Sequence, residues 1–302
     1  MARKGLISLL NNDFLMEKRL MELDPSLHRR VSDSLFALRH ILSRYLLYFP
    51  EYTDHAETHS MAVIEYCNNL IGEKRIMDMN ADELYVLLMA CYLHDIGMGL
   101  FVKDYEEFSE RIDFGDYFEI HQEITEREVI RAFHNDFSAC FIEKYYEFFD
   151  IPTKEHVFAI AQTARGHRKA DLYDEQAYPS NLSFHNGNTA CLPYLAAIIR
   201  MGDEVNVAED RNSKILFNPN NYSTEKQRLE NEKHRAIKRM TIYPDKIQLD
   251  VKTEEVDVLN AVSNLAIKLQ RTLDYCRSVV DNRTPYEMTQ KKVILNTIEE
   301  ER

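Results

Sequence analysis

Glycine and proline are scarce in this chain of 302 residues. It has 8 of each, about half the usage typical of soluble proteins. β-Sandwiches and β-barrels need many tight turns, and tight turns draw on both residue types. We therefore expect a mainly α-helical fold.

Paired cysteines and long apolar runs are also missing. The five cysteines are widely spaced and form no CxxC pair. This argues against a disulfide framework or a zinc ribbon and predicts reduced thiols in the core. The first apolar stretch is too short for a signal-peptide core, and no uncharged run approaches the ~20 residues of a membrane span. We expect a cytoplasmic protein with no membrane partner.

Positive charge is in deficit, with 37 Lys and Arg against 50 Asp and Glu and a formal net charge of −13. Proteins that bind nucleic acid usually present a basic face, because neutralising phosphates supplies most of their affinity. No direct nucleic-acid binding is expected. An anionic substrate must be held locally, by metal or by a few cations.

The apolar pattern divides the chain into three parts. Residues 1-50 carry helical spacing and predict N-terminal packing helices, and residues 51-212 form a helical core rich in histidine. In residues 213-302 the spacing of apolar residues changes, and part of it becomes an alternation of apolar and polar residues. A hairpin is predicted around the turn at 243–246, followed by a long amphipathic helix over 258–280 and a final strand at 293–298. The fold class expected is a helical bundle with a small C-terminal α+β extension.

Two acidic residues fall on apolar stripes. The stripe of Leu84, Leu87 and Cys91 continues in register to His94 and Asp95. A second stripe, over 192–199, leads into Asp203. Burying an isolated carboxylate costs several kcal/mol or more, and no Lys or Arg lies one turn from Asp95 on the same face. Both acids therefore need a partner from elsewhere in the fold.

Several histidines show the same placement. His59 shares a helical face with Val63, His55 lies one turn earlier, and His167 continues a stripe over 157–164. His121 also lies beside apolar neighbours, but it fits an apolar helical stripe less well than the other three histidines do. A lone inward histidine is more often a hydrogen-bonded core residue than a ligand. Three or more of them together with two unpaired acids favour a divalent cation, which neutralises carboxylates and accepts imidazole nitrogen. The six other histidines carry no stripe or motif: His28, His40, His134, His156, His185 and His234.

These residues form a familiar pattern. The segment YTDHAETHSMAVIEY, then CYLHDIGMG, then LAAIIRMGDEVNVAEDR resembles the HD superfamily of metal-dependent phosphohydrolases, with its order H…HD…D on a helical core. The resemblance spans roughly 52–211. It implies that four residues bind a first metal ion: His59, His94, Asp95 and Asp203.

Branches of that superfamily imply further roles. In cyclic-nucleotide phosphodiesterases a histidine four residues before the first ligand donates a proton to the leaving group, and His55 has that separation here. In members of the HD-GYP type, extra histidines hold a second metal ion bridged by the HD aspartate, which would assign His121 and His167 to it. The Gly-Tyr-Pro signature is missing, so cleavage of cyclic dinucleotides is not implied. The layout is also similar to bacterial HD domains found alone or beside Hsp90-like ATPase modules.

The resulting hypothesis is hydrolysis of a phosphoester or phosphoanhydride bond, most simply of a nucleotide, by metal-activated water. His55 would be the general acid, and Asp95 would bridge one or two divalent ions (Mn, Mg, Fe, Zn or Ni). Cations near the motifs are candidates for phosphate binding, although solvated surface charge is the simpler interpretation of each: Lys103, Arg165, Arg168 and Lys169.

Two alternatives stay open. The chain could be a non-catalytic module that senses a nucleotide or binds a partner, or a di-iron oxygenase built on a related helical core. The amphipathic helix over 258–280 leaves a homodimer or an ATPase-type protein partner open as well. The substrate and the metal are not fixed by these patterns.

Overall fold

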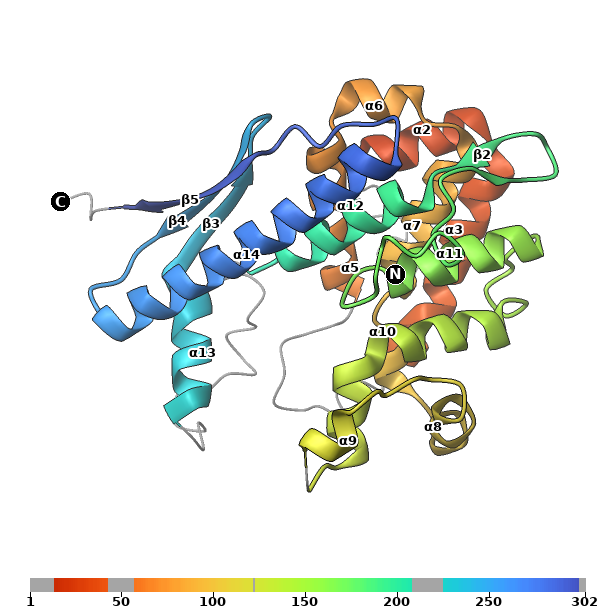
Figure 1. Ribbon diagram of the computed structural model, residues 1–302. Coiled ribbons are helices and arrows are strands. Elements are labelled where there is room, and N and C mark those ends of the chain that lie inside the picture. The colour runs from red at the N-terminus through yellow and green to blue at the C-terminus, as the bar shows by residue number, and fades with distance from the viewer. Residues whose placement is uncertain (1–13, 43–56, 122, 208–224, 299–302) are drawn as a thin grey trace, which may run out of the picture.

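A fully buried helix forms the centre of the fold. The computed structural model describes residues 14–42, 57–121, 123–207 and 225–298. Beyond its first turn, helix α7 (Ala81–Leu93) is apolar on all sides, and α5 (Glu57–Ile71), α11 (Lys154–Arg165) and α12 (Leu192–Glu204) pack around it (Figure 1). A helix with no polar face must be surrounded by protein. The helix begins at a capping box. The Asn80 side chain accepts a hydrogen bond from the Glu83 backbone N–H, and the Glu83 side chain accepts one from the Asn80 backbone N–H.

The described N-terminal helices cover one side of α7. Helices α2 (Leu15–Leu23) and α3 (Pro25–Leu42) both pack on it. Met16 and Leu20 are fully buried, and Glu17 accepts a hydrogen bond of 2.9 Å from the Tyr92 hydroxyl of α7. Helix α6 (Glu73–Asp78) follows α5 closely and packs on α2. Among the described residues, no single helix has both the length and the apolar content of a membrane span, and one pair that has them jointly, Ala81–Gly99 with Val102–Ser109, is bent by 103°.

A bent helix carries the other half of the bundle. After α7 come a 3₁₀ turn, η1 (Ile96–Gly99), and two short helices, α8 (Val102–Ser109) and α9 (Tyr117–Ile120). Helix α10 (Glu126–Tyr145) contains a kink at Phe133, where φ is −121° and ψ is 18°. Its C-terminal part packs along α11 and η1.

A buried acid ties a small hairpin to the bundle. Strands β1 (Leu182–Ser183) and β2 (Thr189–Ala190) pair antiparallel. Asp82 accepts hydrogen bonds from Asn186 (2.9 Å), Asn188 (2.6 Å) and His156 Nε2 of α11 (2.8 Å). Burial alone would raise the pKa of Asp82, but these three hydrogen bonds lower it to about 2.

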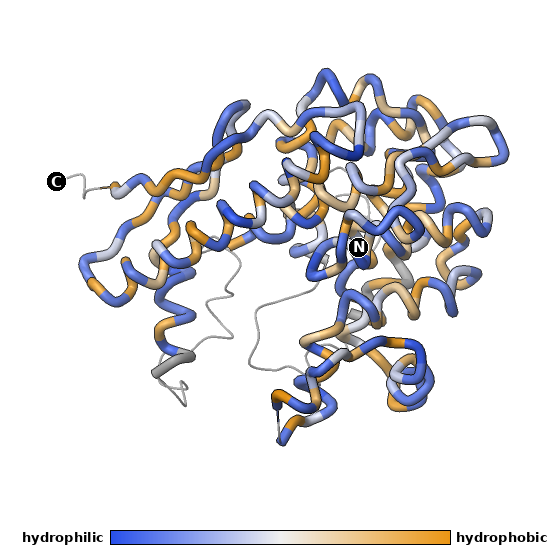
Figure 2. The backbone as a smooth tube through the Cα atoms, in the orientation of Figure 1, coloured by the Kyte–Doolittle hydropathy of each residue, from blue (hydrophilic) through white to orange (hydrophobic). Residues whose placement is uncertain are grey.

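The C-terminal part is a small sheet with one long helix, as the sequence predicts. Strands β3 (Ile237–Ile242) and β4 (Lys246–Val251) form the hairpin, with Met240 opposite Leu249. Helix α14 (Val256–Arg283) then returns the chain so that β5 (Lys292–Thr297) pairs parallel to β4. The apolar face of α14 packs on α12 and on α13 (Glu225–Ala236), so this face covers the bundle (Figure 1). Figure 2 shows that α13 is hydrophilic along most of its length, with its apolar positions few.

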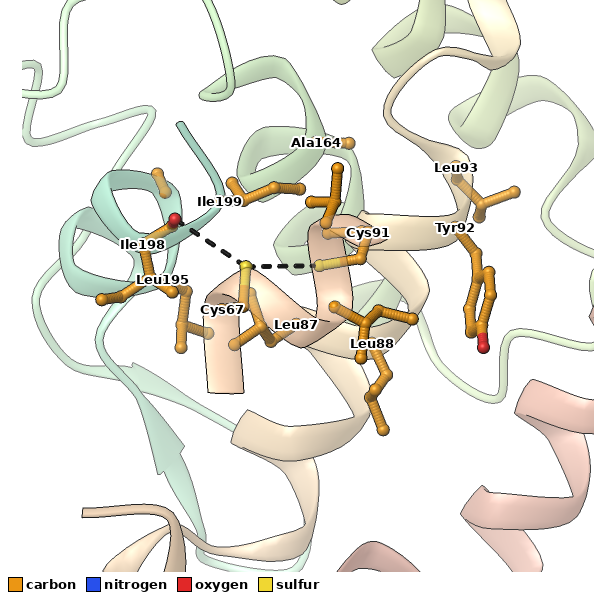
Figure 3. Close-up of a cluster of buried hydrophobic side chains, with 14 of the residues drawn as sticks. Cys67, Leu87, Leu88, Cys91, Tyr92, Leu93, Ala164, Leu195, Ile198 and Ile199 are labelled. Atoms are coloured by element: carbon orange, nitrogen blue, oxygen red, sulfur yellow. Dashed lines mark hydrogen bonds between the residues drawn. The ribbon is translucent and has the colours of Figure 1, made fainter. Parts of the chain in front are cut away.

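The buried hydrophobic side chains form one continuous core, whose members run along the sequence from Met16 to Met288. All five cysteines are buried and free, which confirms the prediction of reduced core thiols. Two of them meet where α5, α7 and α12 join: Cys67 Sγ lies 3.8 Å from both Cys91 Sγ and the Ile198 carbonyl oxygen (Figure 3). The expectation of a mainly α-helical fold with a small C-terminal α+β extension is therefore confirmed.

Candidate metal centre

Six chemically active side chains converge where five segments of the bundle meet. They come from the first turn of α5, the residues just after α7, the kinked part of α10, the turn that follows α11 and the last turn of α12. The side chains are His59, His94, Asp95, His134, His167 and Asp203.

The first group of ligand atoms joins α5, α7 and α12. His59 Nε2 lies 3.1 Å from His94 Nε2, 3.4 Å from Asp95 Oδ2 and 3.2 Å from Asp203 Oδ1. His94 Nε2 lies 3.5 Å from Asp95 Oδ2 and 3.8 Å from Asp203 Oδ1. These four residues are the ones that the resemblance assigns to a first metal ion.

The second group lies on the other side of Asp95. His134 Nε2 is 3.0 Å from His167 Nε2 and 3.3 Å from Asp95 Oδ1. His167 Nε2 is 3.8 Å from the same oxygen. The two oxygens of Asp95 therefore face different groups, Oδ2 the first and Oδ1 the second. This is the arrangement of a bridging carboxylate.

Among its described residues, the centre is most open on the side of Asp203. Both histidines of each group and Asp95 are buried, whereas the Asp203 side chain is 20% exposed. Among the described residues of the centre, Asp203 is therefore the one most accessible to solvent.

Three of the four imidazoles are held in one tautomer by the backbone. Nδ1 of His94, His134 and His167 donates to the carbonyl three residues earlier, at 2.8, 2.7 and 2.6 Å respectively. Cys91 and Ala164 lie in the last turns of α7 and α11, and Arg131 precedes the kink at Phe133 in α10, so all three carbonyls lie where the regular helical hydrogen-bond pattern ends or is interrupted. With the proton on Nδ1, the Nε2 lone pair of each ring points into the centre.

Converging lone pairs and carboxylates fit a cation and little else. Two donors each about 2.1 Å from one ion lie about 3.0 Å apart at a ligand angle of 90° and about 3.8 Å apart at 130°. The Nε2 and Oδ separations in both groups fall in this range. Mixed imidazole and carboxylate donors suit several first-row divalent metals.

The protonation states are those of a ligand set. Burial lowers the pKa of His94 and, more strongly, that of His167, which keeps both rings neutral. For Asp203 burial acts in the opposite direction, but the hydrogen bond and charge of His59 hold its pKa well below the ordinary value. The neutral rings of His94 and His167, beside an ionised Asp203, can bind a cation without first losing protons.

A close backbone contact sets the position of the His-Asp pair against α10. A Cβ added to Gly97 would lie 2.4 Å from the His134 carbonyl oxygen and 2.6 Å from the Ser138 nitrogen. Gly97 N–H donates to Ser138 Oγ at 2.9 Å, and that hydroxyl donates to the His94 carbonyl at 2.6 Å. The absence of a side chain at Gly97 therefore allows η1 to lie on α10, which brings His134 to Asp95.

A buried arginine holds the loop that carries His167. Arg200 Nε donates to the Gly166 carbonyl at 2.7 Å, and Nη2 donates to the Ala170 carbonyl at 2.6 Å. The guanidinium also lies 5.0 Å from the centre of the Tyr275 ring of α14. Arg200 thus fixes the backbone on both sides of His167.

One sequence-based choice is replaced. His121, expected at the second ion, is exposed at the end of α9, where its ring packs on Tyr117 at 4.6 Å between ring centres. His134 occupies the place instead. The signal was present in the sequence, because His134, Phe137 and Phe141 form a stripe at steps of three and four residues, and all three are buried.

The predicted phosphate-binding cations separate into three kinds. Arg168 lies beside the second group, with Nη1 3.3 Å from His134 Nδ1. Arg165 is paired with Asp136 at 2.6 Å, and Lys103 and Lys169 are exposed. His55, the predicted general acid, falls outside the described residues.

The family assignment agrees with this geometry. The sequence model of the HD-CE family matches residues 49–286, well over half of the chain. The chain belongs to the HD-CE family. The match runs through the β3–β4 hairpin and the whole of α14. No curated protein and no solved structure matches the chain.

Proposed function

We propose that this HD-CE protein is a metal-dependent phosphohydrolase that cleaves a phosphoester or phosphoanhydride bond, with a nucleotide as the simplest substrate. The observation that carries the proposal is the position of Asp95, whose two carboxylate oxygens face two separate groups of imidazole nitrogens. Membership of an HD-type family supports the same chemistry.

Divalent cations bound in such a pair of sites polarise phosphoryl oxygens and lower the pKa of water toward neutrality. The residues of the chain hold this chemistry in place. Asp95 spans both groups, and the neutral Nε2 atoms supply donors without adding negative charge. Asp203 faces the exposed rim, so the phosphate would approach from its side. A chain with a net charge of −13 needs such a local centre to hold an anion.

Arg168 is the cation best placed to bind a phosphate oxygen, because it lies beside His134 and is only partly exposed. We expect Arg168→Ala to raise KM for a phosphorylated substrate about tenfold while both ions stay bound. Lys169→Ala is the matched control, since Lys169 is the next residue and is exposed. Equal KM values for the two variants would remove Arg168 from the site.

His55 is proposed as the general acid on the basis of its spacing from His59. A positioned proton donor contributes typically ~10²- to 10⁴-fold to the rate. His55→Ala should therefore lower kcat by a factor in that range and leave the metal content unchanged. Loss of metal in this variant would mean that His55 is a ligand and not the acid.

The deciding experiment strips the protein with a chelator and reloads it with Mn²⁺, Mg²⁺, Fe²⁺, Zn²⁺ or Ni²⁺. Hydrolysis of bis(p-nitrophenyl) phosphate and of a nucleotide panel is then measured, with Asp95→Ala as the inactive control. Activity in the wild type that is lost in the variant supports the proposal. Thermal shifts with nucleotides but no product would favour a sensing module, and O₂ uptake with iron would favour an oxygenase.

A further inference from the structure

His59 is held differently from the other three imidazoles of the centre. In His94, His134 and His167, Nδ1 donates a hydrogen bond to the backbone carbonyl three residues earlier. His59 lies in the first turn of α5, which begins at Glu57, so the residue three positions earlier lies outside the described part of the chain. Its Nδ1 instead lies 2.7 Å from the side-chain amide nitrogen Nδ2 of Asn206. Turned end for end, the same amide presents Oδ1 to the ring and accepts Nδ1–H, which leaves the Nε2 lone pair directed at the centre.

Asn206 is built into the turn that presents Asp203. It follows the last turn of α12, is buried, and donates its backbone N–H to the Asp203 carbonyl at 3.1 Å. The same residue therefore fixes the backbone of one ligand and the ring of another. Both ligands belong to the first group.

The turn that carries Asn206 is itself fixed by the C-terminal part of the chain. Nδ1 of His234, near the end of α13, lies 2.9 Å from the Val207 carbonyl oxygen. Val207 is buried, and its N–H donates to the Val205 carbonyl at 2.9 Å. A continuous path of contacts thus runs from α13 through Val207 and Asn206 to His59.

From this path we propose that Asn206 is a positioning residue for His59, and that His234 of α13 sets the position of Asn206. The C-terminal part of the chain thereby controls the affinity of the first ion site. The inference rests on the proposed metal centre, and it concerns residues outside the ligand set. Partners that orient a ligating histidine typically change metal affinity by about 10- to 100-fold when they are removed.

The first test isolates each ion site. In a His134→Ala/His167→Ala background only the first site remains, and in a His94→Ala background the second site is the one left intact. Affinity for Co²⁺ is measured by competition with a chelating indicator, and the visible absorption of bound Co²⁺ reports the ligand geometry.

In the first-site background, Asn206→Ala should weaken Co²⁺ binding about 10- to 100-fold and change the visible spectrum. Asn206→Asp keeps an acceptor for Nδ1–H and should bind within about threefold of the parent. The exposed Asn264→Ala of α14 is the control and should have no effect. In the second-site background, Asn206→Ala should leave the affinity unchanged. The inference is overturned if both backgrounds weaken equally, which would indicate general loss of structure, or if Asn206→Asp binds as weakly as Asn206→Ala.

The second test addresses His234. His234→Ala should weaken the first site, whereas His234→Asn, whose amide can donate to the same carbonyl, should restore it. Combining His234→Ala with Asn206→Ala should add little to Asn206→Ala alone, because both act through one ligand. Fully additive effects would break the proposed path. A wild type that binds no ion would refute the proposed function, whereas two bound ions with no response to Asn206→Ala would refute this inference alone.

Discussion

Gly97→Ala places one methyl group between the His-Asp pair and α10. Its added Cβ would lie 2.4 Å from the His134 carbonyl oxygen, 2.6 Å from the Ser138 nitrogen and 2.9 Å from the Phe137 carbonyl carbon. All three are backbone atoms of α10, so no side chain can rotate away. Since ordinary contacts begin near 3.4 Å, η1 must move away from α10 by about 1.0 Å, the difference between 3.4 and 2.4 Å.

Such a shift has two measurable consequences. Overpacking a core position costs typically about 1–3 kcal/mol, and weakening the Gly97 hydrogen bond to Ser138 adds about 1 kcal/mol. We therefore expect Gly97→Ala to lower the free energy of unfolding by about 2–4 kcal/mol. Asp95 lies two residues before Gly97, so its 3.3 Å approach to His134 should be lost, and with it the second ion.

Urea unfolding and metal content measured on the same preparations test both consequences. Gly187→Ala is the matched control, because its Cβ meets open space and only its positive φ of 87° costs stability, about 1–2 kcal/mol. That variant should keep both ions. A Gly97→Ala protein with wild-type stability and two bound ions would show that the loop contact does not position the site.

Three further predictions concern the site, the loss of stability at low pH and the C-terminal helix. His134→Ala should lose one of two bound ions by elemental analysis, whereas His121→Ala should keep both; the reverse result would restore the sequence-based choice. Because the folded-state pKa of Asp82 is lowered from 3.8 to about 2, its ionised form stabilises the fold by about 2 kcal/mol above pH 4, and this contribution is lost as the pH falls toward 2. The stability advantage of the wild type over Asp82→Asn, measured by urea unfolding, should shrink over that interval; an advantage independent of pH would contradict it. Leu273→Ala, on the buried face of α14, should lower the free energy of unfolding by about 2–5 kcal/mol. Ile267→Ala, on the exposed face, should lower it by less than about 0.5 kcal/mol. Equal costs would mean that α14 does not pack as described.

Much of the fold follows from periodicity. The hairpin around residues 243–246, the long helix from 258 and the final strand appear where apolar spacing places them. The hairpin and the helix each have a buried face, and the final strand packs partly buried Val293 and Leu295 against the core. The parallel pairing of β5 with β4 does not follow from periodicity, since it depends on where α14 packs after the hairpin.

The candidate site divides in the same way. Asp95 and Asp203 can be found from sequence because an acid on an apolar stripe has no inexpensive partner nearby. The choice between His121 and His134 depends on the kink at Phe133 and on the contact of Gly97 with α10, and both are properties of packing. Asn206 and His234 escape sequence reasoning altogether, since polar residues after a helix are ordinary until their partners are known.

The central claim is that two ions share the Asp95 carboxylate, and the number of divalent ions bound per chain tests it most directly. Elemental analysis of the metal-loaded wild type and of Asp95→Ala, prepared in parallel, gives this number. The account predicts two ions per wild-type chain and fewer than one per variant chain. A wild type that binds no divalent ion, or a variant that still binds two, would contradict it.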